Sequence, residues 1–212
     1  LFPPTQGRVW FNDIDYTNLD KKGILAIRKK VGMLFQGNAL FDSMTIEENI
    51  RFPMDMFTPM TSLEKQMRVD EVLERVSLSG VNLKYPSEIS GGMQKRVGIA
   101  RAIVLKPKYL FCDEPNSGLD PKTSITIDEL ISDITNEEDI TTIINTHDMN
   151  SVMEIGENII LLEAGRLAWK GNKEQVLGTV NKELDAFIFA SPFLKKLVEA
   201  AKNNGKNSLE NL

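Results

Sequence analysis

Two adjacent carboxylates are the residues of this chain that most clearly could do chemistry. Asp113 and Glu114 follow a short apolar run, residues 109–112, and Pro115 comes directly after them. Because proline cannot continue the hydrogen bonding of a strand, the two acids are predicted to stand at a strand end. Paired carboxylates at a strand end suit metal and water chemistry.

A second candidate site lies upstream, where Ser90, Gly91 and Gly92 precede a helical run. Ser90 is a natural N-cap for that helix. A helix start with free N–H groups, small side chains and a positive dipole end is predicted to bind phosphate. The apolar residues of the run are spaced so that they can face a core: Val97, Ile99, Ala100 and Ile103.

Two further polar residues also follow predicted strands. Gln36 comes after residues 31–35, and its amide can bind a hard cation through oxygen and a water through nitrogen. His147, the only histidine, comes after the β-branched residues 140–145. In most proteins a lone glutamine or histidine in such a place is structural, so neither residue indicates a site by itself.

Helices and strands must position these residues. The capping pair Thr45 and Glu48 predicts a helix from about Ile46, and Asp120 before Pro121 predicts another that runs toward residue 134. Further strands are predicted at 8–11, 158–162 and 167–170, and further helices at 24–30, 61–78 and 173–177. Six residues of the helix at 61–78 are predicted to lie on or near one side: Leu63, Met67, Val69, Val72, Leu73 and Val76.

Apolar residues are dense in the segment 41–57, and core packing is the preferred interpretation for most of them. They are Phe41, Met44, Phe52, Met54, Met56 and Phe57. A methionine-rich and partly exposed surface would instead suit the docking of a partner.

Composition limits the function classes. The 212 residues fall within the single-domain range, and 42% hydrophobic residues can form a sizeable core. A net charge of −5 argues against a nucleic-acid partner. The single cysteine, Cys112, fits a reducing compartment, and no apolar run approaches the ~20 residues that span a bilayer.

The order of these motifs resembles that of ATP-binding-cassette (ABC) nucleotide-binding domains. SGG, a basic helix, an apolar run and DEP resemble the signature motif followed by Walker B. VGMLFQ resembles the Q-loop, Asp120 stands at the D-loop position, and His147 at the H-loop position. The resemblance implies an α/β P-loop NTPase (RecA-like) core with an inserted α-helical subdomain. It implies four parts: 1–36 with core strands to the Q-loop, 37–103 with the helical subdomain and signature, 104–180 with the rest of the core, and 181–212 with a C-terminal helix and tail.

The same resemblance implies an ATPase with ATP and Mg²⁺ as cofactors. Asp113 and Gln36 would hold Mg²⁺, Glu114 would act as general base, and His147 would contact the γ-phosphate. The signature residues would close over ATP held by a second copy in a homodimer: Ser90, Gly91, Gly92 and Met93. Asp120 would lie between the two sites and couple them.

No GxxxxGK[ST] phosphate loop occurs in the sequence, and residues 1–7 read as the end of a helix passing into a turn. Two explanations are open: a chain truncated before or within this Walker A region, and a natural protein without the loop. The abrupt start favours truncation, with N-terminal core strands and the phosphate loop missing. The chain by itself is then expected to be an inactive, non-catalytic fragment.

The segments VGMLFQGNALFDSMTIEENIRFP and ISGGMQKRVGIARAI are similar to the ATPase subunit of phospholipid-trafficking, or maintenance-of-lipid-asymmetry, transporters, also known as toluene-tolerance ATPases. This similarity implies a peripheral protein on the cytoplasmic face of the inner membrane, with an integral membrane permease docked near residues 37–57. The alternative is an ABC ATPase coupled to another importer-type permease.

Two other ABC classes fit less well. An ABC ATPase of DNA repair would insert a long coiled coil, and the roughly 50 residues between Gln36 and Ser90 carry no heptad array. A translation-factor ABC protein would carry two cassettes, and this chain has one. The segment from Asp185 is predicted to be either a docking segment or a terminal helix over the core, and the last ten residues are predicted to be disordered.

Overall fold

The computed structural model describes residues 4–178 and 181–184. Two compact units make up the chain, Leu1–Asn145 and Thr146–Leu212, and each is described by itself. The predicted boundaries at residues 37 and 104 both fall inside the first unit, and the predicted division into parts stays a prediction. The two predictions for the segment from Asp185 lie outside the described residues.

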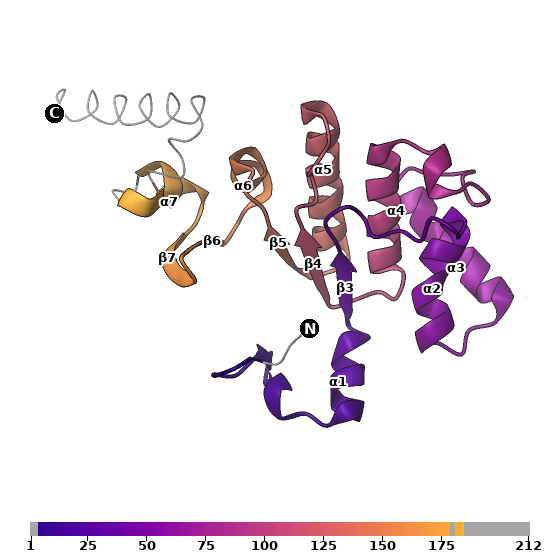
Figure 1. Cartoon of the computed structure of the whole chain (residues 1–212), viewed down its shortest axis with the longest axis horizontal. Helices are drawn as coiled ribbons and strands as arrows, with labels where there is room; N and C mark the ends of the chain where they lie inside the picture. The colour runs from indigo at the N-terminus through magenta and orange to yellow at the C-terminus, as the bar shows by residue number, and fades with distance from the viewer. Residues whose placement is uncertain (1–3, 179–180, 185–212) are drawn as a thin grey trace. The chain divides into compact units, whose positions relative to one another are not determined.

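A three-stranded parallel sheet forms the centre of the first unit (Figure 1). Its strand order is β3 (Val31–Leu34), β4 (Tyr109–Asp113) and β5 (Thr141–Asn145), at three of the predicted places. Leu34 lies opposite Cys112, and Asp113 lies opposite Asn145. Because the strands are parallel, all three carboxyl ends meet at one edge of the sheet.

Two long helices are packed with this sheet in one hydrophobic core. They are α4 (Gly91–Ile103) and α5 (Pro121–Glu137), and the four apolar residues predicted for the core side of α4 are all buried. β3 approaches α4 so closely that a Cβ on Gly32 would lie 2.4 Å from the Ala102 carbonyl oxygen. Any larger residue at Gly32 would force the strand and helix apart.

Two further helices, α2 (Ile46–Phe57) and α3 (Ser62–Arg75), pack on α4 and join the same core (Figure 1). Each begins with a capping box, Thr45 with Glu48 and Thr61 with Glu64. The predicted start at Ile46 is therefore confirmed. The short 3₁₀ helix η2 (Pro86–Glu88) precedes α4.

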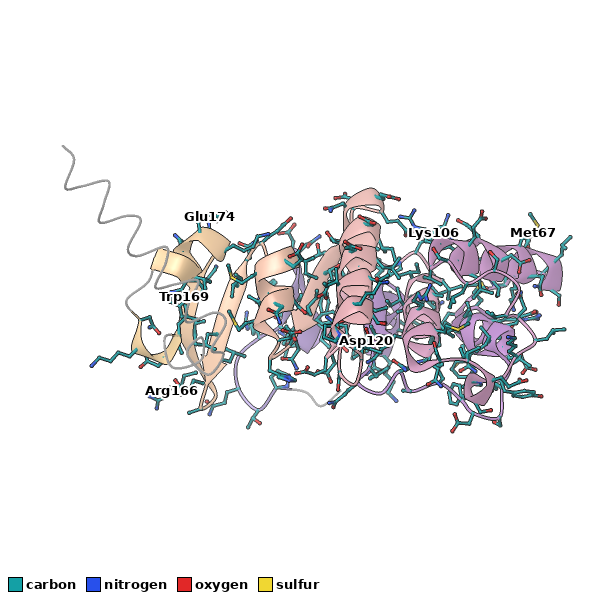
Figure 2. The ribbon with its side chains drawn as sticks, turned by 90° about the horizontal axis from the view of Figure 1, so that it is seen from above. Met67, Lys106, Asp120, Arg166, Trp169 and Glu174 are labelled. Carbon is teal, nitrogen blue, oxygen red and sulfur yellow. The ribbon has the colours of Figure 1, made fainter. Side chains whose placement is uncertain are left out.

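The predicted apolar side of α3 is wrong in part. Four of the six residues are buried, namely Val69, Val72, Leu73 and Val76, but Leu63 is 70% and Met67 64% exposed. At about 100° per residue, Leu63 lies about 120° and Met67 about 160° around the helix axis from Val69. Figure 2 shows Met67 on the outer side of the helical part.

The preference for core packing across segment 41–57 is also wrong for most of its residues. Only Met54 is fully buried, whereas Met56 is 59% and Phe41 41% exposed. The other three are partly exposed: Met44, Phe52 and Phe57. For the residues on α2 the cause is the amphipathic character of that helix, which turns one stripe of residues to the core and the rest outward, whereas Phe41 and Met44 precede the helix.

The N-terminal part of the first unit is a small antiparallel pair followed by helices. β1 (Trp10–Phe11) pairs with β2 (Ile14–Asp15), and η1 (Tyr16–Asn18) and α1 (Lys21–Arg28) follow. The strand predicted at 8–11 is thus only two residues long. The helix predicted at 24–30 begins earlier, because the Asp20 side chain caps it by accepting the Gly23 N–H at 2.8 Å.

The second unit contains α6 (Met149–Ile155), β6 (Ile159–Glu163), β7 (Arg166–Gly171) and α7 (Lys173–Gly178). β6 and β7 form the predicted hairpin, whose turn residues Ala164 and Gly165 have φ of 47° and 73°. Trp169, labelled in Figure 2, packs on a small core of its own with Met149, Val176 and Leu184. Across residues 4–178 and 181–184, no helix has both the length and the apolar character to cross a membrane.

Candidate functional site

The predicted acids stand at the carboxyl edge of the central sheet. Asp113 ends β4, and Glu114 follows it; together they are called the acid pair below. The neighbouring strand holds both residues through Asn145. Its side-chain amide donates to Asp113 Oδ1 at 2.8 Å, and its carbonyl oxygen accepts the Glu114 N–H at 2.8 Å. β5 therefore fixes the acid pair from one side.

The backbone turns sharply at Glu114. Its φ is +47°, a left-handed conformation that is uncommon outside glycine. The Glu114 carbonyl oxygen accepts hydrogen bonds from the Ser117 N–H at 3.1 Å and from Lys95 Nζ at 3.3 Å. With Asn145, these contacts determine the direction in which Glu114 leaves the strand.

Lys95 was not predicted as part of the site. It reaches the acid pair from α4 and is only 2% exposed. Burial lowers the pKa of Lys95, and the carboxylates of Glu114 and Asp113 oppose that shift. A usable signal was its spacing, because Lys95, Ile99 and Ala102 share one buried side of the helix.

Cys112, directly before the acid pair, is enclosed by the core. Burial raises the pKa of its thiol to about 12, while the charge of Lys95 acts in the opposite direction. The side chain is 2% exposed. On β4, Cys112 and Leu110 are therefore the buried residues, whereas Tyr109 and Phe111 are only partly buried.

Ser90 is the N-cap of a helix, as predicted, and the binding of phosphate at this helix start stays a prediction. Residues 90–93 form what is called the signature start below, and Ser90 caps α4 by accepting the Met93 N–H at 3.3 Å. A Cβ on Gly91 would meet nothing within 4 Å, whereas one on Gly92 would lie 2.8 Å from Thr123 Cγ2. Gly91 thus faces open space, and Gly92 is small because α5 packs against it.

Asp120, labelled in Figure 2, is the N-cap of α5, and Thr123 in the first turn of that helix lies against Gly92 of the signature start. Its side chain accepts the N–H groups of Lys122 and Thr123, both at 3.1 Å. A hydrogen bond from the Thr123 hydroxyl is the main cause that lowers the pKa of Asp120. Thr123 therefore connects Asp120, to which it donates, with Gly92, against which its methyl group lies.

Gln36 is exposed two residues beyond β3, at the sheet edge where the acid pair stands. The turn after it contains Asn38 and Ala39, both with positive φ, at 66° and 47°. Arg101 of α4 donates to their carbonyl oxygens at 2.7 and 2.8 Å. Arg101 was also missed, and it fixes the backbone that follows Gln36.

His147 belongs to the second unit, where it is exposed two residues beyond the end of β5. The residue after it, Asp148, is the N-cap of α6, and its N–H donates to Thr146 Oγ1 at 3.0 Å. The predicted contact of His147 with the γ-phosphate stays a prediction.

The side-chain oxygens at the sheet edge suit Mg²⁺ that is bound together with a nucleotide. They suit less well a metal ion that is coordinated by protein side chains alone. In the described part of the chain, no three His, Cys, Asp or Glu side chains gather as a metal-binding group. Mg²⁺ keeps several waters and is usually bound by one or two carboxylates together with substrate phosphates. Asp113 and Gln36 match that pattern.

Comparisons with known proteins show which family the chain resembles. The chain matches the ABC transporter family over residues 1–117. It is 39% identical over 204 residues to the methionine import ATP-binding protein MetN of Carboxydothermus hydrogenoformans, which covers 90% of this chain and 60% of that protein. It is 38% identical over 177 residues to MetN of Xanthomonas campestris pv. campestris, with 83% and 52% covered. The chain thus spans between 52% and 60% of the length of these curated relatives.

Solved structures show the same fold. A dimer of the ATP-binding cassette MJ0796 bound to ADP and Pi superposes with a TM-score of 0.73 at 32% identity, covering 81% of this chain and 75% of that one. CbiO1 of Clostridium perfringens, part of the ABC transporter complex cbiONQ, gives a TM-score of 0.77 at 29% identity, covering 94% and 78%. The predicted α/β P-loop NTPase fold of an ABC ATPase is confirmed.

The phospholipid-trafficking subgroup finds no support among these relatives, whose names describe methionine import. The predicted alternative, an importer-type ATPase, agrees with them better. The wider identification stands: the order of motifs, the fold and the match over residues 1–117 agree that the chain belongs to the ABC transporter family.

Proposed function

We propose that this chain is the ATP-hydrolysing part of a subunit that energises an ABC importer, with ATP and Mg²⁺ as cofactors. The observation that carries the proposal is the acid pair, fixed at the end of β4 by contacts from Asn145 and Lys95. The MJ0796 dimer bound to ADP and Pi supports it, since that cassette is 32% identical to this chain.

Hydrolysis of a phosphoanhydride needs charge neutralisation, alignment and a positioned water more than covalent catalysis. Glu114 accepts a proton from the attacking water, and its fixed backbone keeps the carboxylate in place. Asp113 and Gln36 would hold Mg²⁺, which would neutralise charge on the phosphates. His147 contacts the γ-phosphate and stabilises the charge that develops there.

The signature start serves a different nucleotide from the acid pair. Its N–H groups and the open space at Gly91 suit a phosphate that arrives from outside the chain. We place there the ATP bound by a second copy, so that Ser90 and Met93 close over the partner's nucleotide. Asp120, connected with Gly92 through Thr123, lies between the two sites and couples them. The active form is then a homodimer.

An integral membrane permease docks on the helical subdomain, near residues 37–57. The exposed Met56 and Phe41, whose ring lies 5.0 Å from that of Phe52, offer apolar surface there. The protein then works as a peripheral subunit on the cytoplasmic face of the membrane. Methionine is the first substrate to test, because the relatives are named for methionine import. Loss of methionine uptake on deletion of the gene, with lipid distribution unchanged, is the expected result.

The catalytic assignment is tested in the protein expressed from its complete coding sequence. Glu114→Gln is expected to lower Mg²⁺-dependent ATP hydrolysis by about 10²–10⁴-fold, because it removes the general base. The variant should still form an ATP-dependent dimer, which size-exclusion chromatography detects. Glu129→Gln, on the exposed side of α5, is the control and should hydrolyse ATP normally. Normal hydrolysis by Glu114→Gln, or a monomer in the presence of ATP, would contradict the assignment.

The second candidate is that the 212-residue chain by itself is a non-catalytic fragment. Its sequence contains no GxxxxGK[ST] loop, which would supply the main phosphate contacts. The chain alone is expected to bind ATP weakly and not to turn it over. Hydrolysis by this chain above the level of its Glu114→Gln variant, with Mg²⁺ present, would exclude the fragment interpretation.

A further inference from the structure

We propose that Lys95 is a positioning residue for ATP hydrolysis, which holds the backbone of Glu114 from the helix that starts at the signature. The inference rests on the proposed function, because it concerns the same general base. It adds a mechanical connection: the helix that meets one nucleotide also sets the place of the carboxylate that acts on the other.

The contact lies at one peptide group. Lys95 Nζ donates to the Glu114 carbonyl oxygen at 3.3 Å, and the Ser117 N–H donates to the same oxygen at 3.1 Å. On the other side, the Glu114 N–H donates to the Asn145 carbonyl oxygen at 2.8 Å. Contacts from α4, from β5 and from the following turn therefore meet at the residue whose φ is +47°.

A lysine at this place is costly unless its charge is used. Transfer of an ammonium group into a core is unfavourable, and Lys95 is only 2% exposed on the same buried side of α4 as Ile99 and Ala102. An apolar side chain of similar length would fill the space without that cost. What lysine adds is a donor that reaches the Glu114 carbonyl and a positive charge near the two carboxylates, which favour its charged form.

A second cationic side chain of α4, Arg101, contacts a different segment from the one that Lys95 contacts. Arg101, six residues further along the helix, donates to the carbonyl oxygens of Asn38 and Ala39 in the turn after Gln36. The two cations thus hold two different segments of the sheet edge. Lys95 donates to the Glu114 carbonyl oxygen and Arg101 to the turn after Gln36, so removal of Lys95 should change the rate of hydrolysis rather than the segment beside Gln36.

The test is Lys95→Met in the protein from the complete coding sequence. The variant keeps the length and apolar stem but loses the donor, and its kcat should fall by about 10–10²-fold, as expected for a small misplacement of a catalytic group. KM for ATP and the ATP-dependent dimer should stay unchanged. Lys95→Arg, which keeps a charged donor, should recover part of the rate.

Lys65→Met is the matched control. Lys65 is also buried, 9% exposed, and its Nζ lies 2.8 Å from Asp55 Oδ1 in the α2–α3 pair. Its replacement should lower the melting temperature and leave kcat unchanged. A fall in kcat of the same size in both lysine variants would show that loss of stability alone explains the effect, and would overturn the proposal.

A double-mutant cycle with Glu114→Gln separates positioning from a general structural role. Because Lys95 acts through Glu114, Lys95→Met should not slow a Glu114→Gln protein further. Losses that multiply, or a Lys95→Met variant with the wild-type rate, would overturn the inference. If the Lys95→Met variant does not fold, Lys95→Gln takes its place in the same double-mutant cycle with Glu114→Gln.

The outcome for the wild-type protein distinguishes the two proposals. No hydrolysis by the complete wild-type product would overturn the proposed function, and this inference with it. Wild-type hydrolysis together with an unaffected Lys95→Met variant would overturn only the role of Lys95.

Discussion

The acid pair and the signature start are built in opposite ways, although both belong to the first unit. The acid pair is held by its own chain, with hydrogen bonds from Asn145 to Asp113 and from Lys95 to Glu114. The signature start is exposed at Ser90 and Gly91, and a side chain on Gly91 would meet open space.

The difference follows from what each place must do. A general base must keep its position while a water reacts, so its backbone is fixed before the nucleotide arrives. A helix start binds phosphate through N–H groups that must stay accessible until the ligand reaches them. The acid pair is therefore preorganised by the chain, and the signature start is completed from outside it.

The largest expected effect is in thiol reactivity. Cys112, below the acid pair, is buried with a pKa raised to about 12, whereas Ser90→Cys would place a thiol at an exposed helix start. At pH 8 the buried thiol should be alkylated about 10³-fold more slowly than the introduced one, because so little of it is thiolate. Peptide mass spectrometry follows each thiol separately. Equal alkylation rates would show that the Cys112 thiol is accessible to solvent, and would contradict its burial.

The same thiol gives a pH dependence of known sign. Its pKa is raised from 9.0 to about 12 in the folded state, so between these values the folded protein binds more protons than the unfolded chain. Stability therefore falls as pH rises through this range. In the Cys112→Ala variant, the free energy of unfolding should fall less between pH 9 and pH 12 than it does in the wild-type protein. Urea denaturation at each pH measures this difference.

The next effect compares the two glycines of the signature start. Gly92→Ala should lower the free energy of unfolding by about 1–3 kcal/mol, because its Cβ would lie 2.8 Å from Thr123 Cγ2. Gly91→Ala meets nothing within 4 Å and should stay within about 0.5 kcal/mol of wild type. Thr123→Ser, which removes that methyl group, should restore part of the stability lost in Gly92→Ala. Equal losses in both glycine variants would contradict the distinction.

The smallest effect concerns the caps. Ser90→Ala should cost about 0.5–1 kcal/mol, because it removes one 3.3 Å hydrogen bond at an exposed helix start. Thr45→Ala should cost more, since the capping box with Glu48 loses contacts in both directions. Denaturant unfolding measures both, and a larger loss for Ser90→Ala would mean that the signature start is more firmly built than its contacts indicate.

Local chemistry explains which parts of the fold could be predicted. The helix starts behind Thr45, Ser90 and Asp120 were found because a cap and its N–H partners lie within three residues of one another. The wrong side assigned to Leu63 and Met67 depended instead on how the helix is turned against its neighbours. Sequence spacing alone did not fix that rotation.

The parts of the site that were missed depend on distant contacts. Lys95 donates to the carbonyl oxygen of Glu114, which is 19 residues away in the sequence. Arg101 donates to that of Ala39, which is 62 residues away. The motifs identified the family because they are contiguous and ordered along the chain. The transported substrate could not be read in the same way, since the residues quoted for the subgroup belong to the ATPase and not to a permease.

A mixing experiment tests most directly whether the acid pair and the signature start serve different nucleotides. Ser90→Arg, which blocks the signature start, and Glu114→Gln, which removes the base, are each expected to be inactive as homodimers. In a mixed dimer, one site would combine an intact acid pair from one subunit with an intact signature start from the other. An equal mixture should then recover about a quarter of the wild-type ATPase rate, because roughly half of the dimers are mixed and each has one whole site. A mixture no more active than the average of the two variants would contradict the account.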